Sequence, residues 1–173
     1  MQFASGALQT RFGYDEIQAG NYITIMWFLA AVCNIPVGWY TNKYGNDWPI
    51  IIAGSILMTG AHVIYLLSPD CDQCWESIVP LMILGLSYSI YSVLLYVTLA
   101  HFVDDSMMGK AYGISGVFLN FGRVIFPPLI GKIQEDSELS HGYFWVEICF
   151  VAVSILAFII NCIVYSSIRK QKI

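Results

Sequence analysis

The sequence predicts an all-α membrane protein with five transmembrane helices. Of its 173 residues, 57% are hydrophobic and only 12% are charged, and the mean hydropathy is +0.64. Soluble globular domains carry about 25% charged residues. Five apolar segments each contain about 20 or more residues, the length that a helix needs to cross a bilayer. Lysine and arginine are also concentrated in every second connection between these segments, as they are in multi-pass membrane proteins.

The predicted spans cover residues 17–40, 48–67, 78–103, 111–133 and 143–168. Residues 1–13 are mixed in character, and we interpret them as the end of a truncated helix. Pro49 falls in the first turn of its span, where proline is tolerated. We predict polar connections at 41–47, 68–77, 104–110 and 134–142, and a basic tail at 169–172. The whole chain, 1–173, is expected to form one unit.

The distribution of basic residues predicts the orientation of the chain. Arg11 and Lys132 fall on one side of the predicted membrane, and five basic residues fall on the other: Lys43, Lys110, Arg169, Lys170 and Lys172. The richer side is normally cytoplasmic, so the C-terminus is expected in the cytoplasm. The first residues lack the basic start and apolar core of a signal peptide. The net charge of −4 does not indicate nucleic acid.

Small and polar residues recur at helical spacing in four of the five spans, which places them on one face of each helix. Helix packing explains many of them, because small residues permit close approach and hydroxyl and amide groups bond between helices. The other explanation is a cavity enclosed by the helices. Our candidates for lining such a cavity are Asn34, Tyr88, Tyr91, Tyr96, Asn120 and Arg123.

Arg123 is the most unusual of these candidates. It lies about 12 residues into its span, or roughly 18 Å along a helix that rises 1.5 Å per residue. A mid-membrane arginine costs about 2.5–3.5 kcal/mol on the insertion scale, so it needs water, a carboxylate or backbone carbonyls. One hypothesis places it in a cavity, where it attracts a substrate carboxylate. The other is a structural pair with carbonyls or with a residue outside this chain.

The remaining ionisable and sulfur-bearing residues have simpler interpretations. His62 and His101 fit structural hydrogen bonds better than proton relays, and Glu147, near the start of its span, fits the membrane interface. Cys71 and Cys74 lie on the predicted non-cytoplasmic side, where a disulfide is more natural than a metal site, because zinc would require a second pair. No nucleophile–base set or phosphate-binding loop occurs, so the sequence indicates neither an enzyme nor a metal or other cofactor.

Four motifs follow one another in the second part of the chain: Gly85-Leu86-Ser87-Tyr88-Ser89, Gly109-x-Ala111-Tyr112-Gly113, Asn120-x-Gly122 and Gly142-Tyr143-x-x-x-Glu147. In order and spacing they resemble the major facilitator superfamily of transporters, and within it the lysosomal dipeptide transporter branch. The resemblance runs from about residue 12 to residue 165. It implies the C-terminal half of a protein with two six-helix halves and a substrate site between them.

Residues 38–45 resemble the signature loop of that superfamily, through Gly38, Asn42, Lys43 and Gly45. The family pattern usually has an aspartate where Asn42 stands and a basic residue where Asn46 stands. At these two positions the chain lacks the charged residues that form the pairing between helices in the family pattern.

The function implied by the resemblance is movement of small solutes, such as dipeptides or amino-acid-like molecules, across a lysosomal or other endomembrane. The expected partners are the lipid bilayer, a small-molecule substrate, and a missing N-terminal half or another membrane subunit. An alternative is a structural subunit, a degenerate half-transporter within a larger membrane complex. The chain could be a fragment or a naturally truncated product, and its residues leave both open.

Overall fold

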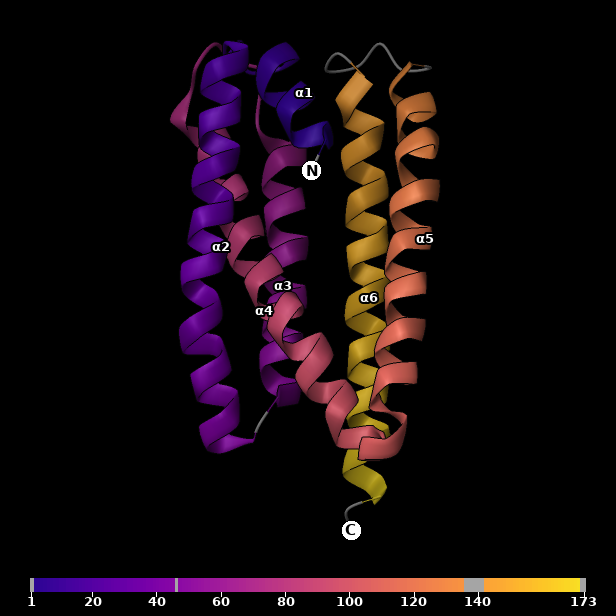
Figure 1. Ribbon diagram of the computed structural model, residues 1–173. Coiled ribbons are helices and arrows are strands. Elements are labelled where there is room, and N and C mark those ends of the chain that lie inside the picture. Colours follow the sequence, from indigo (N-terminus) through magenta and orange to yellow (C-terminus); the bar gives the residue numbers. More distant parts are fainter. Residues whose placement is uncertain (1, 46, 136–141, 172–173) are drawn as a thin grey trace.

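The predicted all-α membrane fold is confirmed by the computed structural model, which describes residues 2–45, 47–135 and 142–171. Every regular element in this described part is helical, and five helices are long and apolar enough to cross a membrane (Figure 1). The elements in chain order are α1 (Gln2–Thr10), α2 (Glu16–Tyr44), α3 (Asp47–Leu67), η1 (Trp75–Ser77), α4 (Ile78–Phe102), η2 (Asp105–Met107), α5 (Met108–Glu135) and α6 (Tyr143–Gln171).

The helices extend beyond several of the predicted spans. The helix α2 ends at Tyr44 rather than at residue 40, so most of the connection expected at 41–47 is helical. Gly45 ends it in the left-handed conformation, with φ 61°, and its amide donates to Thr41 O at 2.8 Å. The difference arises because hydropathy measures the thickness of the membrane, whereas a helix continues until a residue such as glycine terminates it. Likewise, α5 begins three residues before its predicted span and ends two residues after it, and α6 ends three residues after its span.

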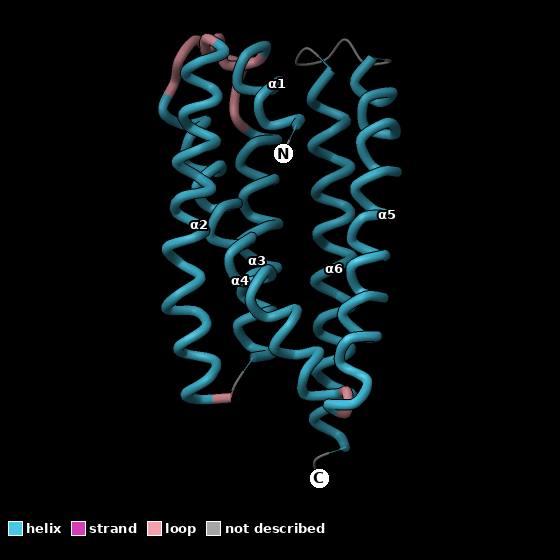
Figure 2. The backbone as a smooth tube through the Cα atoms, viewed as in Figure 1, coloured by secondary structure: helices cyan, strands magenta, loops and turns pink. Residues whose placement is uncertain are grey.

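The start of α2 is specified locally. Asp15 is the N-cap, its carboxylate accepts from the Glu16 amide at 2.8 Å, and Gln18 completes a capping box by accepting from the Asp15 amide at 3.3 Å. Such a cap satisfies amides that the first helical turn leaves unpaired. The loops that join the helices lie at the two ends of the bundle (Figure 2). The acidic connection predicted at 134–142 lies largely outside the described residues.

The helix α4 crosses the bundle obliquely, and the most extensive packing is between α3 and α4, α2 and α4, and α3 and α6 (Figure 1). Two glycines permit these close approaches. A Cβ atom on Gly85 would lie 2.9 Å from Met26 O on α2, and one on Gly54 would lie 2.8 Å from Ile90 Cγ2 on α4. By contrast, α5 packs only sparsely, against α6 and the end of α4. The five-helix unit is therefore tight around α4 and open around α5.

Replacement of Gly85 by alanine should weaken the contact between α2 and α4. Overpacking costs about 1–3 kcal/mol, more than the helix propensity gained from the methyl group, which is about 1 kcal/mol. Gly60→Ala is the matched control, because Gly60 is also inside a helix and its Cβ would meet nothing within 4 Å. We expect Gly85→Ala to lower the melting temperature in detergent and Gly60→Ala to leave it unchanged or raised. Equal melting temperatures for the two variants would contradict the packing argument.

Candidate functional site

The six cavity candidates lie on three helices and do not form one cluster. Tyr88 and Tyr96 on α4 and Asn120 and Arg123 on α5 are exposed, whereas Asn34 on α2 and Tyr91 on α4 are half-buried. The exposed residues have surfaces available to a partner, and the half-buried ones bond to neighbouring helices. The two groups therefore need separate accounts.

Arg123 and Asn120 lie one turn apart on α5, a helix in which Ile130 is the one fully buried residue among those described. Neither side chain makes a hydrogen bond or ion pair with any residue that the structure describes. Cβ atoms on Gly113 and Gly116, earlier in the same stripe, would also meet nothing within 4 Å. Within residues 2–45, 47–135 and 142–171, this face of α5 is thus open to groups from outside the chain.

Two aromatic pairs connect α4 to its neighbours. The Tyr88 ring meets Trp27 of α2 edge-on, with 4.9 Å between ring centroids, and the Tyr96 ring meets Tyr112 of α5 at 5.6 Å. Edge-to-face contacts at these separations are favourable for aromatic rings. Because the second pair joins α4 to the sparsely packed α5, it is part of what holds that helix in place.

Asn34 joins α2 to α4 through hydroxyl groups. Its amide lies 2.8 Å from Ser89 Oγ and 3.2 Å from Ser92 Oγ. Ser92 Oγ already donates to Ser89 O at 3.0 Å, so we orient the Asn34 amide nitrogen toward the two hydroxyls, from where it also reaches carbonyl oxygens of Ala30 and Ser89. The geometry is that of an interhelical link, and part of the side chain remains accessible.

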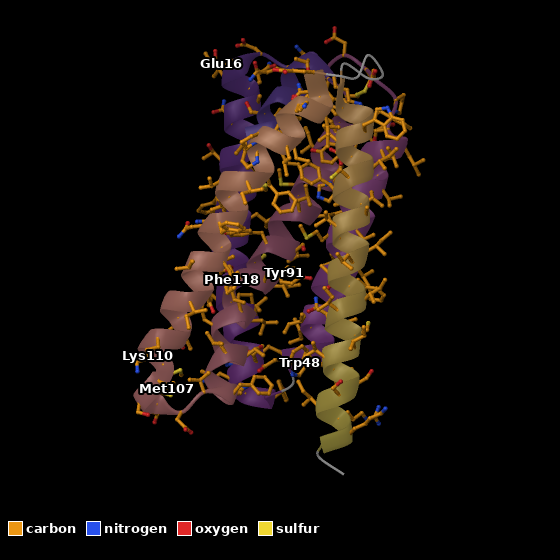
Figure 3. The ribbon with its side chains drawn as sticks, turned by 90° about the vertical axis from the view of Figure 1, so that its right-hand side faces the viewer. Glu16, Trp48, Tyr91, Met107, Lys110 and Phe118 are labelled. Carbon is orange, nitrogen blue, oxygen red and sulfur yellow. A yellow bond between two sulfur atoms is a disulfide. The ribbon has the colours of Figure 1, made fainter. Side chains whose placement is uncertain are left out.

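Tyr91 belongs to a polar cluster that joins three helices. Its hydroxyl bonds to Ser55 of α3 and accepts from Asn161 Nδ2 of α6 at 3.2 Å, while the same amide donates to Ser55 Oγ at 2.9 Å. Tyr91 and Asn161 also border a mainly apolar cavity of about 340 Å³ between α3, α4 and α6, with Trp48 on its lining (Figure 3). The sequence did not reveal that Tyr91 and Asn161 are partners. The available signal was that each lies in a stripe of small and polar residues at helical spacing within its own span.

A smaller space of about 300 Å³ lies between α4 and α5, where Leu95, Ser115, Phe118 and Leu119 border it. Figure 3 shows Phe118 on α5, above Met107 and Lys110 at the end of the bundle. This space and the exposure of α5 indicate that α5 packs loosely against α4.

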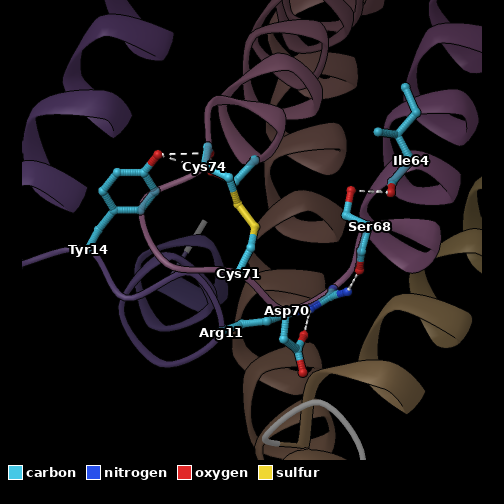
Figure 4. The surroundings of a disulfide bond; sticks show 8 residues. Arg11, Tyr14, Ile64, Ser68, Asp70, Cys71 and Cys74 are labelled. Atoms are coloured by element: carbon cyan, nitrogen blue, oxygen red, sulfur yellow. Dashed lines mark hydrogen bonds and ion pairs between the residues drawn. A yellow bond between two sulfur atoms is a disulfide. The ribbon is translucent and has the colours of Figure 1, made fainter.

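A compact cap closes one end of the bundle. The Arg11 guanidinium, 5% exposed, donates to Asp70 at 2.6 Å, to Tyr65 O at 2.7 Å and to Ser68 O (Figure 4). Cys71 and Cys74, the pair expected from the sequence, are joined in a disulfide. Tyr14 donates to Cys74 O at 2.9 Å. These contacts attach the end of α1 to the connection between α3 and α4.

At the opposite end, the residues of the predicted signature loop are mostly helical. Gly38, Asn42 and Lys43 lie within α2, and only Gly45 lies outside it. The Lys43 ammonium sits 4.7 Å from the Trp39 ring centroid, a cation–π contact. A pairing that the sequence did not reveal lies beside this segment: His101 at the end of α4 contacts the buried Asp47 carboxylate at the start of α3 at 3.1 Å.

The position of Glu147 at the membrane interface stays a prediction, and the structure adds that its side chain is buried against α3. Its side chain is 9% exposed, and its Oε2 lies 2.8 Å from His62 Nδ1 on α3. The partner stands 85 residues earlier in the chain, so periodicity within α6 could not reveal it. For metals, the described residues contain no group of three histidine, cysteine, aspartate or glutamate side chains close enough to bind an ion.

The family model described as Major Facilitator Superfamily matches residues 2–171. The chain belongs to this superfamily. Its members are membrane transporters and not enzymes. The chain is similar to proteins named lysosomal dipeptide transporter MFSD1, with 22% identity to that of Danio rerio and 23% to that of Homo sapiens, over 90% and 93% of its length. It is 26% identical over 86% of its length to the uncharacterized MFS-type transporter YvkA of Bacillus subtilis.

These matches cover 32–33% of each relative's length, so the chain spans about a third of the superfamily members that it resembles. No solved structure matches the chain significantly. The recognition made from the four motifs is therefore confirmed at the level of the superfamily and of similarity to that branch.

The Tyr91–Asn161 contact should contribute measurable coupling energy. Hydrogen bonds between membrane helices average about 0.6 kcal/mol and reach about 1.7 kcal/mol in double-mutant cycles. We expect a value in this range from Tyr91→Phe and Asn161→Ala, singly and combined, in reversible unfolding from mixed micelles. Tyr96→Phe combined with Asn161→Ala is the control, because the Tyr96 hydroxyl has no hydrogen bond to the described residues. A coupling energy no larger than that of the control cycle would contradict the Tyr91–Asn161 hydrogen bond.

Proposed function

We propose that this chain forms one half of a two-half transporter that moves small solutes across a membrane by alternating access, with dipeptides or amino-acid-like molecules as substrates. The observation that carries the proposal is the open polar face of α5, on which Arg123 and Asn120 lack partners among the described residues. The similarity to lysosomal dipeptide transporters supports the substrate class.

The position of Arg123 in the membrane gives a physical reason for it to bind a substrate. It stands near the middle of α5, between Met108 and Glu135, where neither end of the helix is within easy reach. An arginine in hydrocarbon without a partner is costly, so this side chain requires water or an anion. A cavity between two halves supplies both, and guanidinium matches a carboxylate by two parallel hydrogen bonds. In this proposal Arg123 binds the carboxylate terminus of the substrate, and Asn120 adds an amide one turn away.

The other cavity candidates surround this face in the proposal. Tyr88 and Tyr96 present exposed edges from α4, and Asn34 keeps part of its amide accessible while it links α2 to α4. Tyr91 contributes less directly, since its hydroxyl is occupied by Ser55 and Asn161. Substrate sites near the midplane between two repeats are characteristic of such transporters, and rocking of one half against the other exposes the site alternately.

A second candidate function is a structural subunit. One observation favours it: Asn42 and Asn46 depart from the signature pattern. Detection of a covalently continuous N-terminal half in the native protein would favour transport. Stable co-purification of a 173-residue form with unrelated membrane subunits would favour the structural role.

Loss of the Arg123 charge should reduce recognition of a substrate carboxylate in the complete transporter. A hydrogen bond to a charged group contributes about 1.5–3 kcal/mol, so KM for a dipeptide should rise by at least about tenfold in Arg123→Leu. The same variant should lose the preference of the wild type for a free dipeptide over its C-terminal amide, measured as competing uptake. Lys132→Leu, which removes an exposed charge from the last turn of the same helix, is the control.

An unchanged preference in Arg123→Leu, with normal assembly, would remove Arg123 from the binding site. Arg123→Lys separates charge from geometry, because lysine keeps the charge but lacks the planar donor pair. We expect this variant to be intermediate in KM.

We further propose that the C-terminus faces the cytoplasm and that the Cys71–Cys74 cap faces the lumen of a lysosome or another endomembrane compartment. The bias of five basic residues against two supports this orientation. A C-terminal tag should be clipped by protease in sealed vesicles with the cytoplasmic side outward, and reduced Cys71 and Cys74 should resist an impermeant thiol reagent there. Protection of the tag, or labelling of the two cysteines, would reverse the orientation.

A further inference from the structure

The connection between α3 and α4 packs against the segment that links α1 to α2. Each residue from position 11 to position 14 contacts one residue of this connection: Arg11 meets Asp70, Phe12 meets Gln73, Gly13 meets Asp72, and Tyr14 meets Cys74. The Gln73 amide donates to Phe12 O at 2.8 Å, and a Cβ atom on Gly13 would collide with the Asp72 carboxylate. These contacts attach the end of α1 to the α3–α4 connection.

The disulfide between Cys71 and Cys74 lies among these contacts (Figure 4). The ring that it closes contains Asp72 and Gln73. Gln73 has φ 50°, and it is the one residue other than glycine with a positive φ in the described ranges. This conformation is unfavourable for a residue with a Cβ atom, so it persists only where the surrounding structure imposes it. The ring and the bond to Phe12 impose it together, so opening of the ring weakens that bond.

The disulfide lies between solvent and the core beneath α1. Cys71 and Cys74 are half-buried, whereas the two residues between them, Asp72 and Gln73, are exposed. Both cysteines also pack against the buried cluster that includes Leu8 of α1. A small reagent can therefore reach the ring from outside, and a change in the ring reaches the packing of α1 directly.

The charges around the ring favour one class of reagent. The exposed ionisable residues of the connection are all acidic: Asp70, Asp72 and Glu76. The basic side chain that contacts the connection, Arg11, is 5% exposed and is paired with Asp70. A thiol that carries a further negative charge is repelled by such a surface, whereas a thiol with an ammonium group is attracted to it. The surface thus suits a small aminothiol.

We propose that the Cys71–Cys74 disulfide is a thiol-exchange site at which a small aminothiol loosens α1 from the α3–α4 connection. The thiolate of the reagent attacks one sulfur and forms a mixed disulfide, and the other cysteine leaves as a thiolate that takes up a proton. A second molecule of the reagent attacks the mixed disulfide, which frees the remaining cysteine as a thiol. Two aminothiols become one disulfide, and two electrons and two protons pass to the protein. The site does not depend on the transport function, because its reaction is measured without a substrate.

Trypsin cleavage after Arg11 reports the attachment of α1. In the oxidised protein the Arg11 side chain is buried and bonded, and Phe12 is 0% exposed, so the bond between them is protected. Cysteamine treatment of the purified full-length protein in detergent should raise this cleavage by about fivefold or more. Proteolysis follows the population of the open form, which the loss of a hydrogen bond increases by that order. Cleavage after Lys110, exposed at the opposite end of the bundle, is the internal reference in the same peptide mass spectra and should not change (Figure 3).

Serine variants separate the disulfide from other effects of the thiol. Cys71→Ser combined with Cys74→Ser should show the raised cleavage without cysteamine, and cysteamine should add nothing further. Cys33→Ser, which removes a free cysteine of α2, should behave as the wild type. The wild-type comparison needs no substitution, so it decides the matter even where the double variant does not fold. Equal cleavage after Arg11 in the oxidised and reduced wild type would overturn the proposal, and so would a disulfide that resists cysteamine until the whole protein unfolds.

The class of reagent is tested with two thiols of opposite charge, cysteamine and mercaptoethanesulfonate. The ratio of their reduction rates at low ionic strength should be about threefold or more higher for the wild type than for Asp72→Asn combined with Glu76→Gln, because each acid contributes to the attraction. A comparison of ratios cancels the intrinsic reactivity of the two reagents. The difference should vanish in about 1 M salt, where exposed charges are screened. Equal ratios for the two proteins at low ionic strength would overturn the assignment of an aminothiol.

Discussion

The structure depends on one constraint: within hydrocarbon, each polar group must find its partner inside the protein. The helix α4 meets this requirement most fully. Ser87 donates to Gly54 O of α3 at 2.9 Å, Tyr91 bonds to Ser55, and the serines near Asn34 link the helix to α2. Gly85 allows the serines to reach Asn34, because it brings the backbones of α2 and α4 together, and Gly54 permits the close approach of α3 to α4. The polar residues of α4 thus serve mainly to join three helices into one rigid group.

The polar residues of α5, Asn120 and Arg123, also require partners. They find no partners among the described helices, and the helix is attached through α6 and through one aromatic contact with the end of α4. A helix with few internal contacts can shift at low cost, because few bonds must break. The chain therefore joins a tight group, α2, α3, α4 and α6, to one looser helix, α5. The surface that we assign to the substrate lies on the helix least committed to internal packing.

Sequence alone predicted the number of spans and their nature, because membrane thickness sets a length that apolar runs must satisfy. It could not predict which neighbour a polar face meets. Tyr88 and Tyr91 are three residues apart, yet one ring packs on Trp27 of α2 and the other hydroxyl bonds to α3 and α6. Periodicity gives the direction of a side chain around its own helix, whereas its partner depends on helix positions set by the whole fold. For Arg123, the sequence predicted its depth in the membrane. The structure adds that its side chain has no hydrogen-bond or ion-pair partner among the described residues.

The seam between α3 and α6 shows why such polar contacts are needed at all. Leucine and isoleucine pack against lipid tails as favourably as against another helix. Apolar faces alone therefore cannot fix the position of one membrane helix along another. On α6 the buried or half-buried polar residues recur every seven positions, at Glu147, Ser154 and Asn161. Two of them have partners on α3: Asn161 bonds to Ser55 and Glu147 to His62, and these two partners are seven residues apart. Seven residues complete two helical turns, so these side chains form one line on each helix. Polar pairs at two levels therefore set the register of α6 against α3.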